Sequence, residues 1–200
     1  MTQQKVAAVI LAAGGSSRLG RPKQLLDWFG KTFIKQLIDL AHEAQLDPVI
    51  LVTGANYEVI EQSISSETIV IARNDAWQDG QSSSMKVGVK SLEEHQVDSF
   101  IIFLCDQPHV PLELIDKIID ESQNDELDIV ATSVAGKICP PTLFKARCSE
   151  GIMALKGDQG GRVLFKSYNT KILEWEDERL LQDSDTEEDY AKLINLYSID

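Results

Sequence analysis

The sequence lacks long hydrophobic runs, paired cysteines and a positive net charge. No apolar run approaches the about 18 residues that a membrane-spanning helix needs, which argues against a membrane protein. The three cysteines are odd in number and share no metal-ligand spacing, so neither a disulfide framework nor a cysteine metal site is expected. A net charge of −13 argues against nucleic acid and anionic membranes as partners. Residues 1–5 have no signal-peptide layout, and these absences together favour a cytoplasmic location.

Two common nucleotide-binding motifs are also absent. A Walker A loop needs a lysine directly after its second glycine, whereas Arg21 follows Gly20 here and the next lysine is Lys23. The glycine pair Gly14-Gly15 is followed by four residues without glycine, so the dinucleotide fingerprint G-x-G-x-x-G is missing. No repeat, low-complexity segment or linker interrupts the 200 residues, and this length suits one domain with a full core.

What the chain does contain is an alternation of apolar strands and amphipathic helices. Apolar runs predict strands at 6–11, 49–54, 68–72, 100–105, 128–132 and 171–175. Helical spacing predicts helices at 33–45, 57–64, 112–119 and from about 186 onward, and a further helix through Val87, Val89 and Leu92. A polar loop is predicted at 74–84, a loop with a short strand at 136–144, and a glycine-rich turn at 157–162 opening a helix to about 168. This rhythm predicts an α/β, Rossmann-like fold with an open, mostly parallel sheet and helices on both faces.

Charge is distributed unevenly along the chain. Residues 1–37 carry six Lys or Arg against one Asp, whereas residues 174–189 carry nine acids against one Arg. A basic segment inside an acidic protein suits a small anionic ligand. The acidic segment either holds a divalent cation or forms a solvated face.

The most informative segment is the loop of residues 11–23, called the signature loop below. It contains three glycines, two adjacent serines and three cations, and it follows the first predicted strand. Glycines permit close backbone approach to a ligand, and Arg18 and Lys23 offer charge to phosphate oxygens. The loop therefore predicts a phosphate-binding site, with a basic surface turn as the alternative.

Aspartates form the second candidate feature. Asp106 follows the strand at 100–105, and open α/β sheets bind ligands at the carboxyl ends of their strands. There it either binds Mg²⁺ through carboxylate oxygen or caps the next turn. Asp183 and Asp185 precede Thr186, where they either hold a metal or begin the last helix. The sequence shows no Ser–His–Asp or Cys–His grouping.

The signature loop carries a family resemblance. It reads Leu-Ala-Ala-Gly-x-Ser-x-Arg-x-Gly-x-x-Lys, which resembles the signature of the MobA-like nucleotidyltransferases. Residues 21–26, Arg-Pro-Lys-Gln-Leu-Leu, make it most similar to the molybdenum cofactor cytidylyltransferase branch. The later segments 80–84, 106–108 and 183–190 recur in the family's order, so the resemblance covers nearly the whole chain.

The resemblance implies a single nucleotidyltransferase domain over residues 1–200, of the nucleotide-diphospho-sugar transferase type. A nucleotide-binding half is implied at about 1–110 and an acceptor-binding half at about 111–200. Catalytic roles are implied for four residues: Arg18, Lys23, Asp106 and Asp185. Asp106 and Asp185 are implied to hold Mg²⁺ or Mn²⁺.

Binding residues are implied in the same way. Those implied for the nucleotide are Leu11, Ala12, Ala13, Gly14, Gly15, Ser16, Ser17, Arg18, Lys23, Gly80, Ser82, Ser83 and Ser84. Those implied for the acceptor are Gln107, Pro108, Pro141, Gly157, Asp158, Gly160, Gly161 and Arg162.

The implied reaction transfers CMP from CTP to the phosphate of a molybdopterin-type cofactor and releases pyrophosphate. Ala13 favours CTP over GTP, because guanylyl-transferring relatives tend to carry Leu-Ala-Gly-Gly at this point. A molybdenum hydroxylase or its chaperone is a further implied partner. The alternatives are a GTP-dependent molybdenum cofactor guanylyltransferase, a sugar- or alditol-phosphate nucleotidyltransferase, and a non-catalytic nucleotide- or cofactor-binding chaperone for a molybdenum enzyme.

Overall fold

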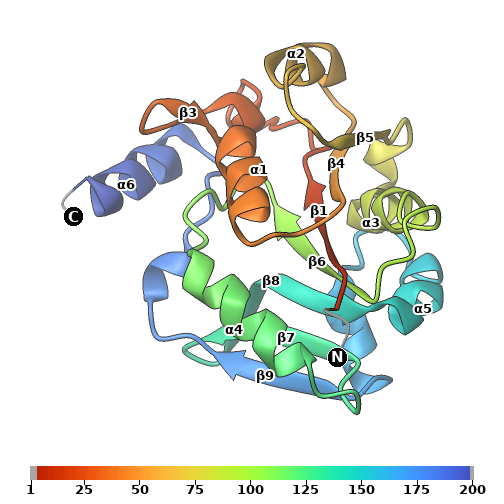
Figure 1. Ribbon diagram of the computed structural model, residues 1–200. Helices are drawn as coiled ribbons and strands as arrows, with labels where there is room; N and C mark the ends of the chain where they lie inside the picture. Colours follow the sequence, from red (N-terminus) through yellow and green to blue (C-terminus); the bar gives the residue numbers. More distant parts are fainter. Residues whose placement is uncertain (1–3, 199–200) are drawn as a thin grey trace.

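Seven strands form one mixed sheet in the computed structural model, which describes residues 4–198 (Figure 1). The strands are β1 (Val6–Leu11), β4 (Val49–Thr53), β5 (Val70–Arg73), β6 (Ser99–Leu104), β7 (Ile129–Val134), β8 (Lys137–Lys145) and β9 (Thr170–Glu174). Their order is β5-β4-β1-β6-β8-β7-β9, and only β8 runs antiparallel to its neighbours. The prediction of an open, mostly parallel sheet is confirmed.

Six α-helices and five 3₁₀ turns connect the strands of the described chain. The helices are α1 (Phe33–Glu43), α2 (Tyr57–Ser63), α3 (Gln81–Lys90), α4 (Leu112–Ser122), α5 (Ser149–Met153) and α6 (Glu187–Tyr197). The 3₁₀ turns are η1 (Lys23–Leu25), η2 (Trp77–Asp79), η3 (Ala146–Cys148), η4 (Gly161–Lys166) and η5 (Glu178–Leu181).

Helices cover both faces of the sheet, as predicted. Side chains of β1 alternate between the faces: Ala8 and Ile10 pack with α1, α2 and α4, whereas Ala7 and Val9 pack with α3 and α5. Because both faces are covered, all six residues of β1 are buried, which explains its continuous apolar character. Figure 1 shows α1 and α4 on the near side of the sheet.

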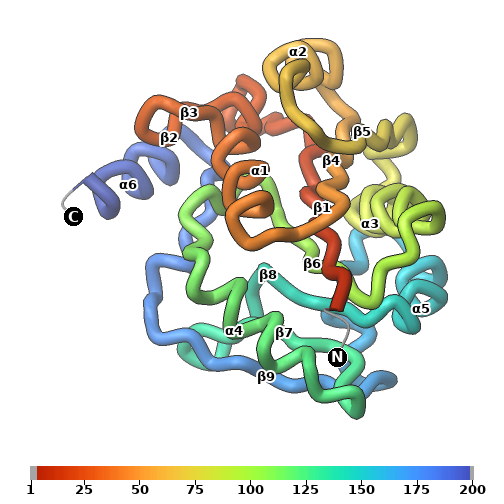
Figure 2. Tube along the Cα trace, in the orientation of Figure 1, coloured from red at the N-terminus to blue at the C-terminus, as the bar shows by residue number. Residues whose placement is uncertain are grey.

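A small hairpin that the sequence did not predict anchors the last helix. Strands β2 (Asp27–Trp28) and β3 (Lys31–Thr32) form it, and Figure 2 shows it beside α6. The Tyr190 hydroxyl donates to the Asp27 carbonyl over 2.9 Å, and Trp28, Phe33 and Leu193 share one apolar cluster. These contacts hold the start of α6 close to the signature loop.

Three predicted boundaries are wrong. The segment 136–144 is predicted as a loop with a short strand, but residues 137–144 belong to the nine-residue strand β8. The loop predicted at 74–84 ends at Gly80, and its serines lie in the first turn of α3. The helix predicted to run to about 168 is the 3₁₀ helix η4, which ends at Lys166.

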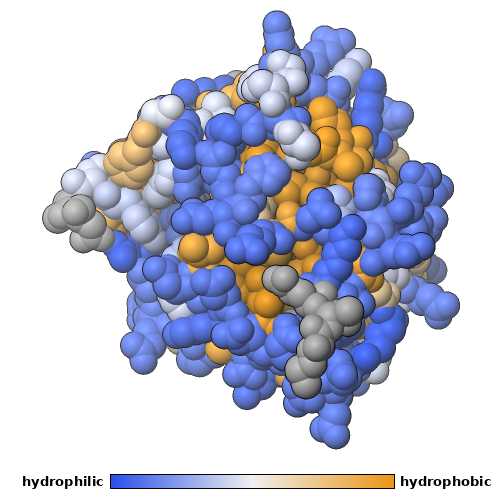
Figure 3. Space-filling model, in the orientation of Figure 1, coloured by the Kyte–Doolittle hydropathy of each residue, from blue (hydrophilic) through white to orange (hydrophobic). Residues whose placement is uncertain are grey.

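No helix in residues 4–198 combines the length and apolar composition that spanning a membrane requires. Hydrophilic side chains cover most of the face shown in Figure 3. Residues 1–3, on which part of the signal-peptide expectation depends, lie outside the described residues.

Candidate active site

The two segments singled out by the sequence leave the sheet side by side. Strands β1 and β6 are parallel neighbours, with Leu11 opposite Leu104. The signature loop continues from β1, and Asp106 follows β6 by two residues. On one side of β1 the next strands are β4 and β5, and on the other side is β6. The candidate site therefore lies where the strand order reverses, the usual ligand position of such sheets.

The signature loop is held in shape by its own polar groups. Ser16 has a left-handed backbone (φ +52°), and its carbonyl accepts from the N–H groups of Leu19 and Gly20, each over 3.1 Å. Its hydroxyl oxygen accepts from the Lys23 backbone N–H over 3.0 Å. Ser16 therefore closes the loop, a structural task that the sequence prediction did not include.

Gln24 stabilises the signature loop through hydrogen bonds to its backbone, a role that the sequence analysis did not predict. Its side chain is fully buried, and Nε2 donates to the carbonyls of Ala12 (2.7 Å) and Gly14 (2.9 Å). Both acceptors fix the orientation of the amide, since an oxygen could not donate to them. The sequence signal for Gln24 was its place beside Lys23 in the segment 21–26 that carries the family resemblance.

Lys23 joins two aspartates from distant parts of the chain. Its Nζ donates to Asp106 Oδ2 over 3.0 Å and to Asp185 Oδ1 over 2.6 Å. Arg18 donates from its guanidinium to Asp185 Oδ2 over 2.6 Å. The Lys23 and Asp106 side chains are only 13% and 17% exposed, so water screens this pair weakly. The four residues predicted as catalytic thus form one connected group, called the Lys23 cluster below.

The charges of the Lys23 cluster shift the pKa values of its members and of the neighbouring Asp183. Burial would lower the pKa of Lys23, but the charge of Asp106 and the hydrogen bond to Asp185 outweigh it and raise that pKa. The hydrogen bond from Lys23 lowers the pKa of Asp185. Asp183 hydrogen-bonds Gln107 (3.4 Å); partial burial, and then the charges of Asp106 and Asp185, raise its pKa to about 6. Asp185, unlike Asp183, is hydrogen-bonded to Lys23.

Asp106 and Asp185 fit a divalent cation in two respects. The space between them already accepts one cationic atom in contact with both carboxylates. Asp106 Oδ1 is buried without a hydrogen-bond partner, so one strong acceptor remains unused. Within residues 4–198 no group of three or more His, Cys, Asp or Glu side chains has metal-binding geometry. A site with only the two carboxylates of Asp106 and Asp185 suits Mg²⁺, which binds one or two carboxylates and completes its coordination with phosphates and water.

A cleft of about 580 Å³ opens beside the cluster. Ten of the predicted site residues line it: Leu11, Ala13, Gly14, Ser17, Arg18, Lys23, Gly80, Ser84, Asp106 and Asp158. Residues that the sequence did not suggest complete the lining, among them Trp77 and Gln81. The Trp77 ring packs against Gly15, where a Cβ on residue 15 would lie only 3.1 Å from the ring. A lone tryptophan in the polar segment before Gly80 was the available signal.

The predicted serines mainly stabilise the entry to α3. Asn74 donates through Nδ2 to the hydroxyls of Ser83 (2.8 Å) and Ser84 (3.0 Å). Ser83 donates to the Gly80 carbonyl over 2.8 Å, and Ser82 is buried. Of the three, only Ser84 belongs to the cleft lining.

The residues predicted for the acceptor are divided between two environments. Gly160, Gly161 and Arg162 line a second cavity of about 210 Å³, which shares Gln81 and Leu104 with the first. Gly157 lies beside Gly80, and its carbonyl accepts from the Ser82 N–H over 3.1 Å.

Gln107, Pro108 and Pro141 are buried and line neither cavity. The Gln107 amide donates to the Leu180 carbonyl as well as to Asp183. It therefore fastens the segment before α6 to the end of β6.

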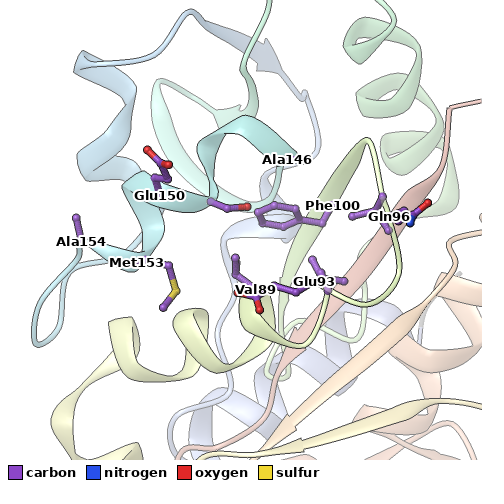
Figure 4. Close-up of a pocket in the computed structure, with 11 residues that line it drawn as sticks. Val89, Glu93, Gln96, Phe100, Ala146, Glu150, Met153 and Ala154 are labelled. Atoms are coloured by element: carbon purple, nitrogen blue, oxygen red, sulfur yellow. The ribbon is translucent and has the colours of Figure 1, made fainter.

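A third hollow, of about 630 Å³, lies at the opposite end of β6 (Figure 4). Phe100 and Val89 contribute apolar surface, and Glu93 and Glu150 are the charged residues among the described ones that line it. It combines no cation with a carboxylate, so the Lys23 cluster marks the better candidate for chemistry.

Comparison with known proteins gives a consistent picture. Residues 8–172 match the model of the MobA-like NTP transferase domain. The chain is 28% identical over 201 residues to the purine catabolism protein PucB of Bacillus subtilis, covering 95% of this chain and 96% of that one. It is 26% identical over 198 residues to nicotine blue oxidoreductase of Paenarthrobacter nicotinovorans (94% and 96% covered). It is 28% identical over 176 residues to a probable molybdenum cofactor guanylyltransferase of Bacillus mycoides (86% of each).

Solved structures agree on the fold. Rv0371c of Mycobacterium tuberculosis superposes with a TM-score of 0.83 at 26% identity, covering 98% of this chain and all of that one. A manganese complex of Rv0371c superposes with a TM-score of 0.80 at 23% identity, covering 96% and 99%.

Proposed function

Because the chain belongs to the MobA-like NTP transferase family, we propose that it transfers a nucleoside monophosphate from a nucleoside triphosphate to a phosphate group, releasing pyrophosphate. The observation that carries the proposal is the Lys23 cluster. Two carboxylates and two cations, drawn from three separate segments, meet beside a cleft lined by a glycine-containing loop. This combination of charges suits a metal–triphosphate complex, because the carboxylates can bind the positive metal ion and the cations can bind the negative phosphates.

The residues would act by positioning and charge rather than by covalent chemistry. We assign the triphosphate to the signature loop and the start of α3, with Arg18 and Lys23 donating to its phosphate oxygens. Asp106 and Asp185 would hold the divalent ion, which, when bound, neutralises charge on the phosphates. An acceptor phosphate oxygen forms the new bond to the α-phosphorus, and the bond to the bridging oxygen breaks. Pyrophosphate leaves with that electron pair, and Arg18 and Lys23 stabilise its charge.

For the donor we propose CTP. Ala13 is 3% exposed and its side chain packs into the space that Gly54 leaves free, since a Cβ at Gly54 would lie 2.8 Å from that of Ala13. Ala13 also lines the cleft, at the position where guanylyl-transferring relatives tend to carry glycine. GTP is the competing donor, because a guanylyltransferase is among the relatives.

For the acceptor we propose a molybdopterin-type phosphate, seated in the second cavity near Arg162. The names of the relatives differ, from a purine catabolism protein to an oxidoreductase, and do not by themselves indicate one acceptor. Support for a molybdopterin-type acceptor comes from the relative named a molybdenum cofactor guanylyltransferase, together with the sequence motifs. Residues 1–110 would then mainly hold the nucleotide and residues 111–200 the acceptor. A molybdenum hydroxylase or its chaperone would receive the product. The three cysteines are free and buried, in keeping with the proposed cytoplasmic location.

The test is pyrophosphate release with each of the four common triphosphates, Mg²⁺ or Mn²⁺, and a molybdopterin source. We expect turnover with CTP. Asp106→Asn should lower kcat by at least about 100-fold, the scale of one lost electrostatic group. Asp39→Asn is the matched control, because it removes the same charge from a surface pair with Lys31 and Lys35.

Three outcomes would change the proposal. Turnover with GTP alone would replace the cytidylyl assignment. Turnover with a sugar phosphate alone would replace the acceptor. Nucleotide binding without turnover of any acceptor would favour a non-catalytic chaperone.

A further inference from the structure

Lys23 occupies the position where the two candidate metal ligands converge. Its ammonium contacts both Asp106 and Asp185, and its side chain is only 13% exposed. Asp106 Oδ2 is bonded to Lys23, and Asp106 Oδ1 is buried from solvent. A divalent ion therefore has to displace the Lys23 ammonium before it can bind Asp106 Oδ2.

We infer that Lys23 is a resident cation of the metal site, and that a divalent ion binds Asp106 and Asp185 only when the Lys23 ammonium leaves them. The inference rests on the proposed function, since it takes these aspartates as the metal ligands. It adds a displacement step that the roles proposed above do not contain.

Charge explains why the two cations exclude each other. An ammonium and a divalent ion between the same carboxylates would lie a few ångströms apart, in a place where water screens them little. Removing Lys23 alone would leave Asp106 without its cation and Asp185 with only the exposed Arg18, which favours binding of another cation. Lys23 therefore stabilises the metal-free site and lowers its affinity for free ions.

A triphosphate provides the alternative partner that Lys23 needs. Lys23 lines the same cleft as Gly14 and Arg18, and four methylene groups let its ammonium move while the backbone stays fixed. Phosphate oxygens in that cleft would draw the ammonium away from the aspartates. Metal and nucleotide would then bind with positive coupling, and each would raise the affinity for the other by the same factor.

Arg18 does not have this role. Its guanidinium contacts Asp185 but not Asp106, and its side chain is 70% exposed. Solvent screens that pair, and an ion could approach Asp106 without displacing Arg18.

The experiment measures Mn²⁺ binding to the whole chain without nucleotide, by the loss of the free-ion electron paramagnetic resonance signal. Lys23→Met keeps an unbranched side chain that is one atom shorter, and it removes the charge. We expect it to bind Mn²⁺ about 5- to 150-fold more tightly than the wild-type protein, the usual range of coupling between two ligands. Lys31→Met is the matched control, because it removes one charge from the same basic segment at an exposed pair with Asp39. Adding Asp106→Asn to Lys23→Met should abolish the gain.

A change of less than twofold for Lys23→Met, or an equal gain for Lys31→Met, would overturn the inference. If Lys23→Met does not fold, wild-type protein with a non-hydrolysable CTP analogue replaces it, and Mn²⁺ affinity should rise within the same range. Turnover in the wild type with no gain in Lys23→Met would refute the displacement alone. A gain in Lys23→Met without turnover of any acceptor would refute the proposed function alone.

Discussion

Replacing Gly80 with alanine tests the junction between the start of α3 and the segment before η4. Gly80 has φ +97° and ψ 177°, a backbone region that is essentially reserved for glycine. A Cβ there would lie 2.5 Å from the Gly157 carbonyl carbon and 2.5 Å from Asp158 Oδ1. The Asp158 side chain can rotate away, but the Gly157 backbone is held by its bond from the Ser82 N–H. The substitution therefore meets both strain and crowding.

The two costs can be estimated separately. Strain at such a backbone conformation costs about 1–3 kcal/mol. Forcing a methyl group against fixed backbone costs about 1–3 kcal/mol more. Gly80→Ala should thus lower the free energy of unfolding by about 2–6 kcal/mol, a large part of the about 5–15 kcal/mol of a typical domain.

Urea unfolding followed by circular dichroism measures this loss. Gly136→Ala is the matched control: its φ is +73°, but no atom lies within 4 Å of the added Cβ. It should show strain alone, about 1–2 kcal/mol. If Gly80→Ala loses no more stability than Gly136→Ala, the close approach of Gly157 to Gly80 is refuted. In the enzyme assay Gly80→Ala should also raise the KM for the triphosphate, because Gly80 lines the cleft.

Two further predictions concern buried polar groups. Burial lowers the pKa of His109 to about 4. Between pH 6.5 and pH 4 the imidazole is therefore protonated in the unfolded chain but not in the folded chain. The free energy of unfolding should fall over this range by at most about 3 kcal/mol. His109→Phe places a ring that cannot be protonated between Trp28 and Tyr197, so the variant should not lose this stability at low pH. The free energy of unfolding in urea is measured against pH for both proteins. An equal loss in the two proteins would contradict the prediction. Gln24→Leu deprives the Ala12 and Gly14 carbonyls of their donor and should cost about 1–3 kcal/mol in unfolding free energy. The same variant should raise the KM for the triphosphate, and unchanged stability and KM would show that Gln24 does not brace the loop.

The parallel half of the sheet could be predicted because its signal is local. Each buried strand reads as an apolar run, and the alternation with helices restricts the topology. The position of Asp106 at a strand end could also be predicted, since it depends only on where β6 stops. The contacts of Lys23 with Asp106 and Asp185 could not, because they join residues 83 and 162 positions apart. Nor could spacing alone distinguish Asp185 from Asp183.

The errors have physical causes. Pro140-Pro141 argued for a loop because proline cannot donate to a strand neighbour. In the structure the register between β7 and β8 shifts next to Thr132, whose hydroxyl donates to the Pro141 carbonyl over 2.7 Å, and β8 continues past both prolines. The serines after Gly80 suggested a loop, but Asn74 bonds two of their hydroxyls within the first turn of α3. The hairpin of β2 and β3 has two residues per strand, too few to show a period.

The insertion of β8 between β6 and β7 has a consequence for the order in which the protein is made. On a ribosome, β1, β4, β5 and β6 are translated first, and β6 then presents one unpaired edge. That strand is almost entirely apolar, and an exposed apolar edge recruits other chains. Its partner emerges only after about another 40 residues have been added. The growing chain thus passes through an aggregation-prone stage that ends when Lys145 is released, and proteolytic cutting near residue 110 would recreate it.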